Sequence, residues 1–174
     1  PVNQALAYGA DVEYVLAEAS VSPMAPTEGS TELQLVERLQ ALGFFGDFLI
    51  AKDLCKSVES RLTKALKEVA LHEFKIELPD VHWELNYGPE RTFKGSQLAG
   101  AFAKHPMADK FPESEFYTKP RPFLDGSHFV TTEAGTGLVH MAPDHGEDDF
   151  DLCKANGINP VFAVDAGGQY REDW

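Results

Sequence analysis

The first half of the chain contains two segments whose apolar residues recur at the three- and four-residue spacing of an amphipathic helix. One is expected to begin at a cap formed by Ser30 or Thr31 and to end at Gly43. The other is expected to begin at a cap formed by Asp53. The apolar stripe of the first is Leu33, Val36, Leu39 and Leu42, and that of the second is Leu54, Val58, Leu62, Leu66 and Val69. Both stripes predict helix faces that pack against a core.

Short apolar or alternating runs in the rest of the chain predict strands. These runs cover residues 12–18, 48–51, 74–78, 83–87, 92–94, 127–132, 138–141 and 160–164. Polar, proline-containing stretches at 20–30 and 104–122 predict loops. Many short strands beside few helices indicate a mainly β protein, with a barrel-like core and attached helices rather than a doubly wound sheet.

The candidate chemistry gathers in one stretch, Gly135 to Phe150, which has the sequence GTGLVHMAPDHGEDDF. Glycines on both sides of Thr136 leave the backbone open to close approach by a ligand. A strand carries His140 to its end, and after a turn three acidic residues ending in Asp149 fall in the first turn of a helix that Gly157 ends. The helix dipole favours a carboxylate in that turn. An imidazole and a carboxylate that converge in this way suit a small cationic group such as an ammonium.

The same residues are also compatible with other roles. Glu147, Asp148 and Asp149 fit a solvated helix start, and His140 fits a hydrogen-bonded histidine of the core. Zinc ligation by His140, His145 and Asp149 is a further alternative, although this spacing is not an established zinc pattern and no cysteine is near. A Ser-His-Asp hydrolase has less support, because the chain has no Gly-x-Ser-x-Gly turn. The chain also has neither a dinucleotide-binding glycine pattern nor a phosphate-binding P-loop.

Composition narrows the choice of partners. A chain of 174 residues that is 43% hydrophobic fits one soluble globular domain. Its 15 Lys and Arg against 28 Asp and Glu give a net charge of −13, the opposite sign to a protein that grips phosphates. A nucleic-acid partner would therefore be touched only at an end. No apolar run approaches the roughly 20 residues of a membrane span, so no membrane is expected as a partner.

Two further features bear on the location of the protein. Cys55 and Cys153 lie in helix-like segments with no motif around them, which predicts packing roles in a reducing compartment and hence a cytoplasmic protein. The first residues, Pro1 to Ala5, contain neither an initiator methionine nor a signal-peptide core, which predicts a fragment of a longer protein.

The stretch from Gly135 to Phe150 resembles the editing domain inserted into isoleucyl-tRNA synthetase, a class I aminoacyl-tRNA synthetase. The leucyl and valyl enzymes share the form Gly-Thr-Gly-x-Val, then Pro-x-His and a later Asp. His140 and Gly146 match the isoleucyl enzyme, because the leucyl enzyme has Met and the valyl enzyme Lys at the first position, and both usually have Asp at the second. Further matches are Pro1-x-Asn3 followed by Ala5, residues 93–96 and 105–106, and residues 159–161 before Gly168. Residues 20–43 and 110–122 match less clearly and are expected to be insertions or irregular loops.

The resemblance implies that residues 1–174 form a single editing domain with a closed or distorted six-stranded β-barrel core and peripheral helices. Its implied activity is the hydrolysis of valine wrongly attached to isoleucine tRNA, and of valyl-adenylate. Its implied partners are the 3′ aminoacyl-adenosine end of that tRNA, and valine or valyl-adenylate. Editing would need no metal or other cofactor, whereas the full-length ligase would use ATP and magnesium. Nothing indicates more than a monomer.

The resemblance also assigns roles to individual residues. By similarity, Asp149 binds the α-ammonium of the aminoacyl group and His140 narrows the side-chain pocket against isoleucine, which makes these two the candidate catalytic residues. Asn3 is expected to support the site. The expected substrate-binding set is completed by Gly135, Thr136, Gly137 and His145. The attacking water would be positioned by backbone, threonine hydroxyls and an adenosine hydroxyl, so no protein general base is assigned.

The chain departs from the family at its start. In the family a threonine-rich segment precedes the Pro-x-Asn with which this chain begins, and Thr131, Thr132 and Thr136 do not replace it. The chain is therefore expected to be weak or inactive alone. The missing segment leaves open an aminoacyl-group binding module that does not cut. A freestanding trans-editing deacylase is a separate alternative, against which the start at Pro1 without an initiator methionine argues. The chain also lacks the His-x-Gly-His and Lys-Met-Ser-Lys-Ser signatures, so it is expected not to activate amino acids.

Overall fold

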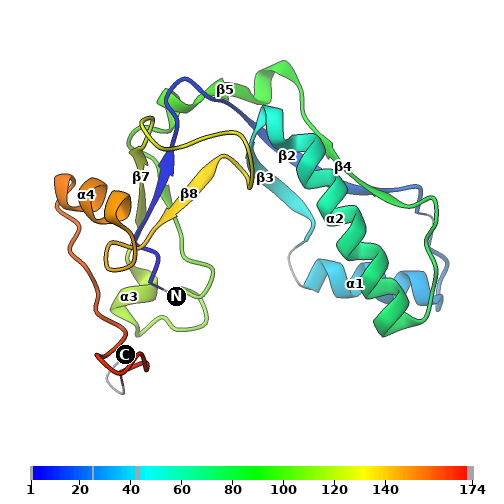
Figure 1. Cartoon of the computed structure of the whole chain (residues 1–174). Coiled ribbons are helices and arrows are strands. Elements are labelled where there is room, and N and C mark those ends of the chain that lie inside the picture. Colours follow the sequence, from blue (N-terminus) through cyan, green and yellow to red (C-terminus); the bar gives the residue numbers. More distant parts are fainter. Residues whose placement is uncertain (1, 25, 42–43, 172–174) are drawn as a thin grey trace. The chain divides into compact units, whose positions relative to one another are not determined.

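The computed structural model describes residues 2–24, 26–41 and 44–171. These residues form two compact units (Figure 1). The first unit contains the described residues up to Val12, then Lys94–Thr131 and those from Leu138 onward, and the second contains Glu13–Phe93 and Thr132–Gly137. The strands make two four-stranded sheets. No helix in the described ranges is long and apolar enough to cross a membrane.

The sheet of the first unit is built around β1 (Ala5–Tyr8). This strand runs parallel to β7 (Arg121–Asp125) and antiparallel to β8 (Leu138–Met141), which Figure 1 shows in yellow beside the dark blue β1. The short β6 (Phe102–Ala103) pairs with the other side of β7. The same unit holds the helices α3 (Glu115–Thr118) and α4 (Glu147–Ala155) and a 3₁₀ turn, Gly95–Leu98.

Small and apolar side chains fill the core of the first unit. The buried cluster is Ala5, Ala7, Leu124, Val130, Met141 and Cys153. Met141 comes from β8 and Cys153 from α4, and both are fully buried. Burial of Cys153 therefore packs α4 against the sheet, and this contact fixes the start of the helix near the end of β8.

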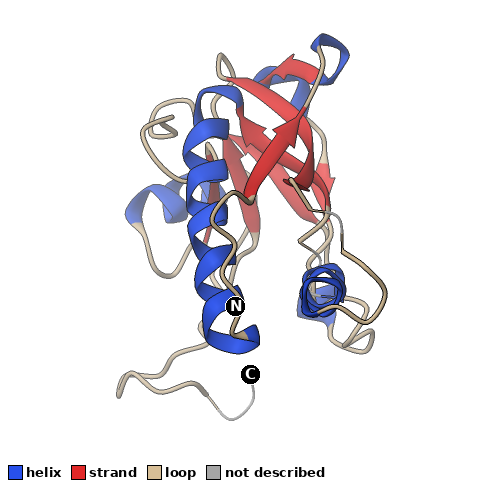
Figure 2. Cartoon of the chain, turned by 90° about the vertical axis from the view of Figure 1, so that its right-hand side faces the viewer, coloured by secondary structure: helices blue, strands red, loops and turns tan. Residues whose placement is uncertain are grey.

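In the second unit β2 (Glu13–Ser22) is the central strand. It pairs antiparallel with β3 (Gly46–Ala51) and β4 (His82–Asn86), and β5 (Thr92–Lys94) also pairs with it. In Figure 2 this unit faces the viewer, with α2 (Cys55–Val69) running down from the strands and α1 (Thr31–Ala41) seen end-on. The remaining turns are 3₁₀ at Lys52–Leu54 and Pro89–Arg91 and π-helical at Ala70–Phe74.

Helix α2 supplies hydrogen-bond acceptors to the backbone of β4. The Trp83 N–H donates to Thr63 Oγ1 and the Leu85 N–H donates to Glu59 Oε1, each at 2.9 Å. Unpaired N–H groups on a strand are costly when buried and can recruit other strands when exposed. These two contacts therefore both hold α2 against β4 and close part of the strand's outer edge.

The predicted helices are both present, with corrections at their caps and faces. Ser30 Oγ accepts the Leu33 N–H at 3.1 Å, which confirms Ser30 as a cap. The Asp53 cap is wrong, because Lys52–Leu54 form a 3₁₀ turn and α2 starts at Cys55 without a side-chain cap. In α1 the buried residues are Leu35 and Leu39, so the predicted stripe missed Leu35. Leu42 and Gly43 lie outside the described residues.

Several strand predictions are confirmed, and others are wrong. Strands β2, β3, β4, β5 and β8 match predicted runs, although β2 extends to Ser22 into the predicted loop. Residues 74–78 form no strand, because the helix continues to Phe74 and Lys75 ends it with a φ of 60°. Residues 127–132 form turns that Gly126 begins, since its carbonyl accepts the N–H groups of Phe129 and Val130. In 160–164 only Val164 makes a bridge, to Tyr170.

The closed six-stranded barrel is a further correction. The described strands form two four-stranded sheets, neither of which closes into a barrel, and helices accompany both of them. The missed strand β7 lies at the end of the predicted 104–122 loop and pairs in parallel with β1, more than a hundred residues earlier. A polar, proline-containing sequence gives no local sign of such a pairing. The fold is thus rich in β structure but is a pair of open sheets.

Candidate functional site

An open cavity of about 500 Å³ lies in the first unit at the end of β8. Its lining residues are Val2, Asn3, His140, Ala142, His145, Val164 and Tyr170. Asn3, His140 and His145 are three of the residues that the sequence analysis singled out. The structure therefore brings Asn3, near the N-terminus, into one cavity with His140 and His145, which lie far from it in the sequence.

Strand alternation presents His140 to this cavity. Met141 is fully buried in the core, while the preceding residue, His140, pairs with Leu6 and is exposed. Successive side chains of a strand point to opposite faces of the sheet. His140 is therefore not a core histidine, and its imidazole is available to a ligand.

Asn3 is held in place through its backbone by a buried arginine. The Arg121 side chain donates from Nε to the Asn3 carbonyl and from Nη2 to the Phe116 carbonyl, each at 2.6 Å, and from Nη1 to the Lys119 carbonyl. Arg121 is only 3% exposed, and its burial lowers the pKa of the guanidinium. Asn3 Oδ1 in turn accepts the Ala5 N–H at 3.1 Å, which fixes the side chain beside the start of β1.

Asp149 connects the first turn of α4 to the residue that follows β8. Its Oδ2 accepts the Ala142 N–H at 2.7 Å, and Ala142 lines the cavity. Asp149 itself is half-buried, whereas Glu147 and Asp148 beside it are exposed. The solvated helix start therefore describes Glu147 and Asp148 but not Asp149, which is fixed by a backbone contact at the edge of the site.

The environment of Asp149 favours negative charge. It lies at the N-terminus of α4, where unpaired N–H groups and the helix dipole attract an anion. Its neighbour one turn later, Cys153, has the pKa of its thiol raised to about 11 by burial and, second, by the charge of Asp149. Both cysteines are free and buried, so their predicted packing roles are confirmed, and Cys153 is no nucleophile at neutral pH.

His145 reaches the cavity from the turn between β8 and α4. Its N–H donates to the Ala142 carbonyl at 2.9 Å, and its Nε2 lies 3.3 Å from Asp144 Oδ2. Ala142 thus contacts both Asp149, through its N–H, and His145, through its carbonyl. The Asp149 carboxylate and the backbone of His145 are therefore bonded to the same residue.

The three residues of the Gly-Thr-Gly segment belong to the second unit. The Thr136 carbonyl accepts the Ala51 N–H at 2.8 Å, and the Gly137 carbonyl accepts the Tyr14 hydroxyl at 2.5 Å. A Cβ added to Gly137 would lie 2.4 Å from the Ala51 Cβ. The group that approaches Gly137 closely is therefore β3 of the same unit, and the substrate-binding role of Gly135, Thr136 and Gly137 stays a prediction.

The two glycines differ in a way that gives a testable prediction. Both have a left-handed φ, +78° at Gly135 and +77° at Gly137, but a Cβ at Gly135 would meet nothing within 4 Å. Gly135→Ala should cost only the left-handed backbone penalty, about 1–2 kcal/mol. Gly137→Ala should cost the same penalty plus about 1–3 kcal/mol for the clash with Ala51. Urea unfolding of the two variants measures this difference, and equal midpoints would contradict the close packing on β3.

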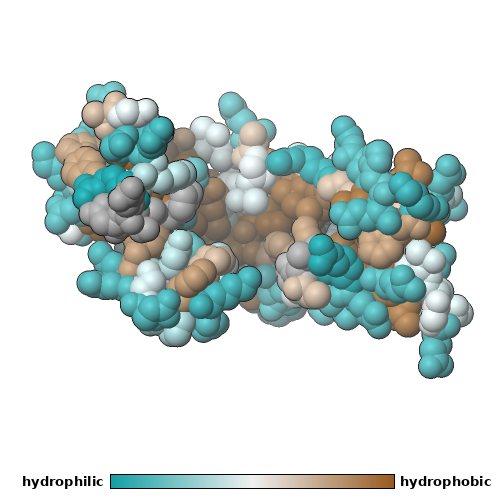
Figure 3. Space-filling model, turned by 90° about the horizontal axis from the view of Figure 1, so that it is seen from below, coloured by the Kyte–Doolittle hydropathy of each residue, from teal (hydrophilic) through white to brown (hydrophobic). Residues whose placement is uncertain are grey.

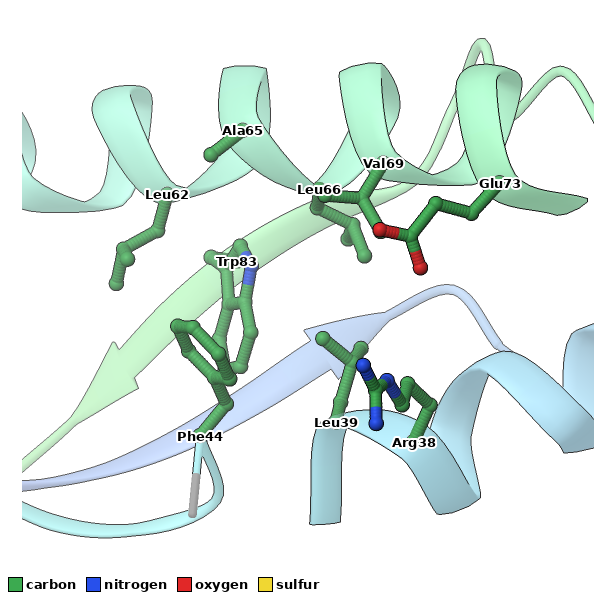
Figure 4. Close-up of a pocket in the computed structure, with 9 residues that line it drawn as sticks. All are labelled: Arg38, Leu39, Phe44, Leu62, Ala65, Leu66, Val69, Glu73 and Trp83. Carbon is green, nitrogen blue, oxygen red and sulfur yellow. The ribbon is translucent and has the colours of Figure 1, made fainter. Parts of the chain in front are cut away.

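A second cavity, of about 180 Å³, lies in the second unit between α1, α2 and β4 (Figure 4). Leucine, alanine and valine side chains of the helices and the rings of Phe44 and Trp83 line it, while Arg38 and Glu73 face each other at one end. Its lining offers no imidazole, hydroxyl or amide to orient a reacting group. The cavity at the end of β8 is therefore the better candidate for chemistry.

Two further observations concern the polarity of the surface and the grouping of potential metal ligands. On the face shown in Figure 3, hydrophilic residues are spread over both units, with hydrophobic residues exposed between them. Among the described residues, His140, His145 and Asp149 included, no three His, Cys, Asp or Glu side chains gather as metal ligands would.

Sequence reasoning missed six residues of this region, of which Val2 and Ala142 line the cavity beside predicted site residues. Arg121 and Asp144 act on Asn3 and His145 through contacts that only the fold creates, and Val164 and Tyr170 come from the last described segment. The signal for Asp144 was its place beside His145. Arg121, in a proline-containing stretch, gave none.

Comparison with known proteins gives a consistent set of relatives. No protein-family model matches the chain. The isoleucine–tRNA ligase of Zymomonas mobilis is 41% identical over 174 residues, which is 100% of this chain and 14% of the ligase. Those of Gluconobacter oxydans and Pelagibacter ubique are 34% and 30% identical over 98% and 99% of the chain. The chain thus spans about 14% of the length of these relatives.

Proposed function

Because the chain belongs to the isoleucine–tRNA ligase family and matches one segment of these ligases, we propose that it is their editing domain. In this role it hydrolyses the ester between valine and isoleucine tRNA. The observation that carries the proposal is the single cavity that gathers Asn3, His140 and His145 beside the Asp149 carboxylate. This set can hold an ammonium and several hydroxyls, which are the polar groups of an aminoacyl-adenosine.

The chemistry of the ligase supplies the reason for a second site. A pocket that selects isoleucine rejects valine, one methylene shorter, by only about 10- to 200-fold, a range known for this enzyme family. Hydrolysis in a pocket that admits valine and excludes isoleucine by size supplies the missing factor. The proposal extends to valyl-adenylate, which presents the same aminoacyl group.

Three polar residues in or beside the cavity have a place in this proposal. Asp149 binds the α-ammonium: a carboxylate has about four lone-pair positions, so the bond from Ala142 does not exhaust its capacity. His140, exposed at the end of β8, narrows the side-chain pocket. Asn3 supports the same wall. The attacking water needs orientation more than it needs a strong base. In this proposal backbone groups, threonine hydroxyls and a hydroxyl of the terminal adenosine provide that orientation.

The charge of the chain fits contact with only the end of a tRNA. A net charge of −13 repels the phosphate backbone over most of the surface. The terminal adenosine and its aminoacyl group, by contrast, present a cation that an acidic site attracts. Other parts of the ligase would therefore hold the tRNA, in the cytoplasm where it is charged, and this segment would receive its 3′ end.

The test is the binding of two non-hydrolysable adenosine amides, one valyl and one isoleucyl, to the 174-residue chain, measured by calorimetry. Tighter binding of the valyl compound supports the size sieve. Deacylation of valyl-tRNA is then measured on the whole ligase. Binding of the valyl amide without any hydrolysis would favour the aminoacyl-binding module instead, and binding of neither compound by chain or ligase would contradict the proposal.

Replacing His140 with alanine should relax the discrimination between the two amides. The imidazole occupies the cavity that the larger side chain would need, so its loss should raise affinity for the isoleucyl compound and reduce the valyl preference by about tenfold. His128→Ala is the matched control, since His128 is also an exposed histidine of the first unit. An unchanged preference in His140→Ala would remove His140 from the sieve.

A further inference from the structure

Asp144 is a buried carboxylate at the edge of the cavity. Its side chain is 6% exposed, and its Oδ2 lies 3.3 Å from His145 Nε2. The Oδ1 atom of Asp144 is fully buried and has no hydrogen-bond donor among the described residues. Buried carboxylates are rare unless paired, and an unpaired buried oxygen is costly. This residue therefore has a reason other than stability to occupy its position.

The contact of Asp144 with the imidazole determines how His145 can act. A neutral imidazole donates from one ring nitrogen and accepts at the other. A carboxylate beside Nε2 favours the proton on Nε2, which leaves the lone pair on Nδ1. A buried carboxylate that fixes the tautomer and orientation of an imidazole is an established way to prepare the other nitrogen for its task.

His145 lies between the buried Asp144 carboxylate and the cavity. Its side chain is 46% exposed and lines the cavity, so the ring is in contact with both the buried carboxylate and the open space. Its backbone N–H is bonded to the Ala142 carbonyl, and the Ala142 N–H is bonded to Asp149. The backbone of His145 and the Asp149 carboxylate are thus both bonded to Ala142, and the imidazole itself is oriented by Asp144.

We propose that Asp144 is a positioning residue that holds His145 in its Nε2–H tautomer, so that Nδ1 accepts a hydrogen bond from an N–H or O–H group of the bound ligand. The identity of that ligand, an aminoacyl ester of ribose, rests on the proposed function. The donor is either the α-ammonium or a ribose hydroxyl. No proton is transferred, and the role of Asp144 is to keep the acceptor lone pair available.

The tautomer can be measured without any ligand. The ¹⁵N shifts of the ring nitrogens of His145, recorded at a pH where the imidazole is neutral, should show the proton on Nε2. In Asp144→Asn the amide N–H₂ can donate to Nε2, so the proton should move to Nδ1. His82, whose Nε2 lies 3.0 Å from Glu84 Oε1 in the second unit, should be unchanged in the variant. A wild-type proton on Nδ1 would overturn the proposal.

The consequence for binding is measured with the valyl-adenosine amide and with its des-amino counterpart. Asp144→Asn should weaken the binding of the valyl amide roughly 2- to 12-fold, as the loss of one hydrogen bond does. A loss confined to the valyl amide assigns the α-ammonium as donor, and a loss for both compounds assigns a ribose hydroxyl. In a His145→Ala background Asp144→Asn should have no further effect, because Asp144 acts through His145.

The outcomes separate this proposal from the proposed function. If the wild-type chain and ligase bind neither compound, the editing function fails while the tautomer measurement still stands on its own. If the wild type binds the valyl amide and Asp144→Asn binds it equally well, the editing function stands and the positioning role of Asp144 is wrong. An additional loss in the His145→Ala background would also overturn it, since Asp144 would then act directly.

Discussion

Replacing Asp149 with asparagine is expected to weaken binding of the valyl-adenosine amide by about 10- to 150-fold. A hydrogen bond between charged partners contributes about 1.5–3 kcal/mol, and the asparagine removes the charge that attracts the ammonium. Asparagine keeps a carbonyl oxygen that can still accept the Ala142 N–H, now bonded to Oδ2 at 2.7 Å. The loss of affinity should therefore occur with the turn between β8 and α4 intact.

The matched control is Asp148→Asn. Asp148 is the preceding residue of the same helical turn, but it is exposed, so the change alters the net charge and the helix dipole interaction equally without touching Ala142. Titration calorimetry of both variants, with thermal melts to confirm folding, makes the comparison. Equal affinities of the two variants for the amide would show that Asp149 is one more solvated acid of the helix start.

The parts of this site that the sequence predicted are those set by local structure. His140 follows from an alternating run before a proline, and the start and end of α4 follow from acidic residues and from Gly157 after Asn156. The cap at Ser30 is local in the same sense. Each of these depends on residues within a few positions, so a pattern in the sequence is enough to place it.

The parts that the sequence did not predict depend on contacts between distant segments. Strand β7 gains its place by pairing in parallel with β1, and Pro122 within it argues against a strand. Pairings of this kind decide which strands join each of the two sheets, and a count of strand-like runs does not contain them. That count therefore suggested a closed barrel, which the described strands do not form. Gly137 illustrates the same limit, because its close contact with Ala51 comes from β3, far away in the sequence.

Arg121 is the clearest case of a site residue that only the fold identifies. A buried guanidinium must have acceptors for its donors, and here carbonyls of Asn3, Phe116 and Lys119 provide them. Its Cζ also lies 4.5 Å from the centre of the Phe116 ring. These contacts connect α3 and the start of β7 to Asn3, two residues before β1, and so they hold one wall of the cavity.

Arg121→Met is therefore expected to destabilise the chain by about 3 kcal/mol, because methionine fills part of the volume but leaves three carbonyls without their donor. For a domain of this size such a loss lowers the melting temperature by roughly 6–12 °C, which calorimetry measures. Binding of the valyl-adenosine amide should weaken as well, since Asn3 loses the contact that fixes its backbone.

Arg91→Met is the control that separates burial from charge. Arg91 Nη2 lies 2.6 Å from Asp47 Oδ1, as close as Arg121 Nε is to the Asn3 carbonyl, but the aspartate side chain is 50% exposed. Exposed ion pairs contribute about 0–1 kcal/mol, so Arg91→Met should shift the melting temperature by no more than a few degrees and leave amide binding unchanged. If the two variants had the same melting temperature, the carbonyl contacts of Arg121 would contribute no more to stability than a surface ion pair does. The cavity wall would then have to be held by the pairing of β1 with β7 and β8 alone.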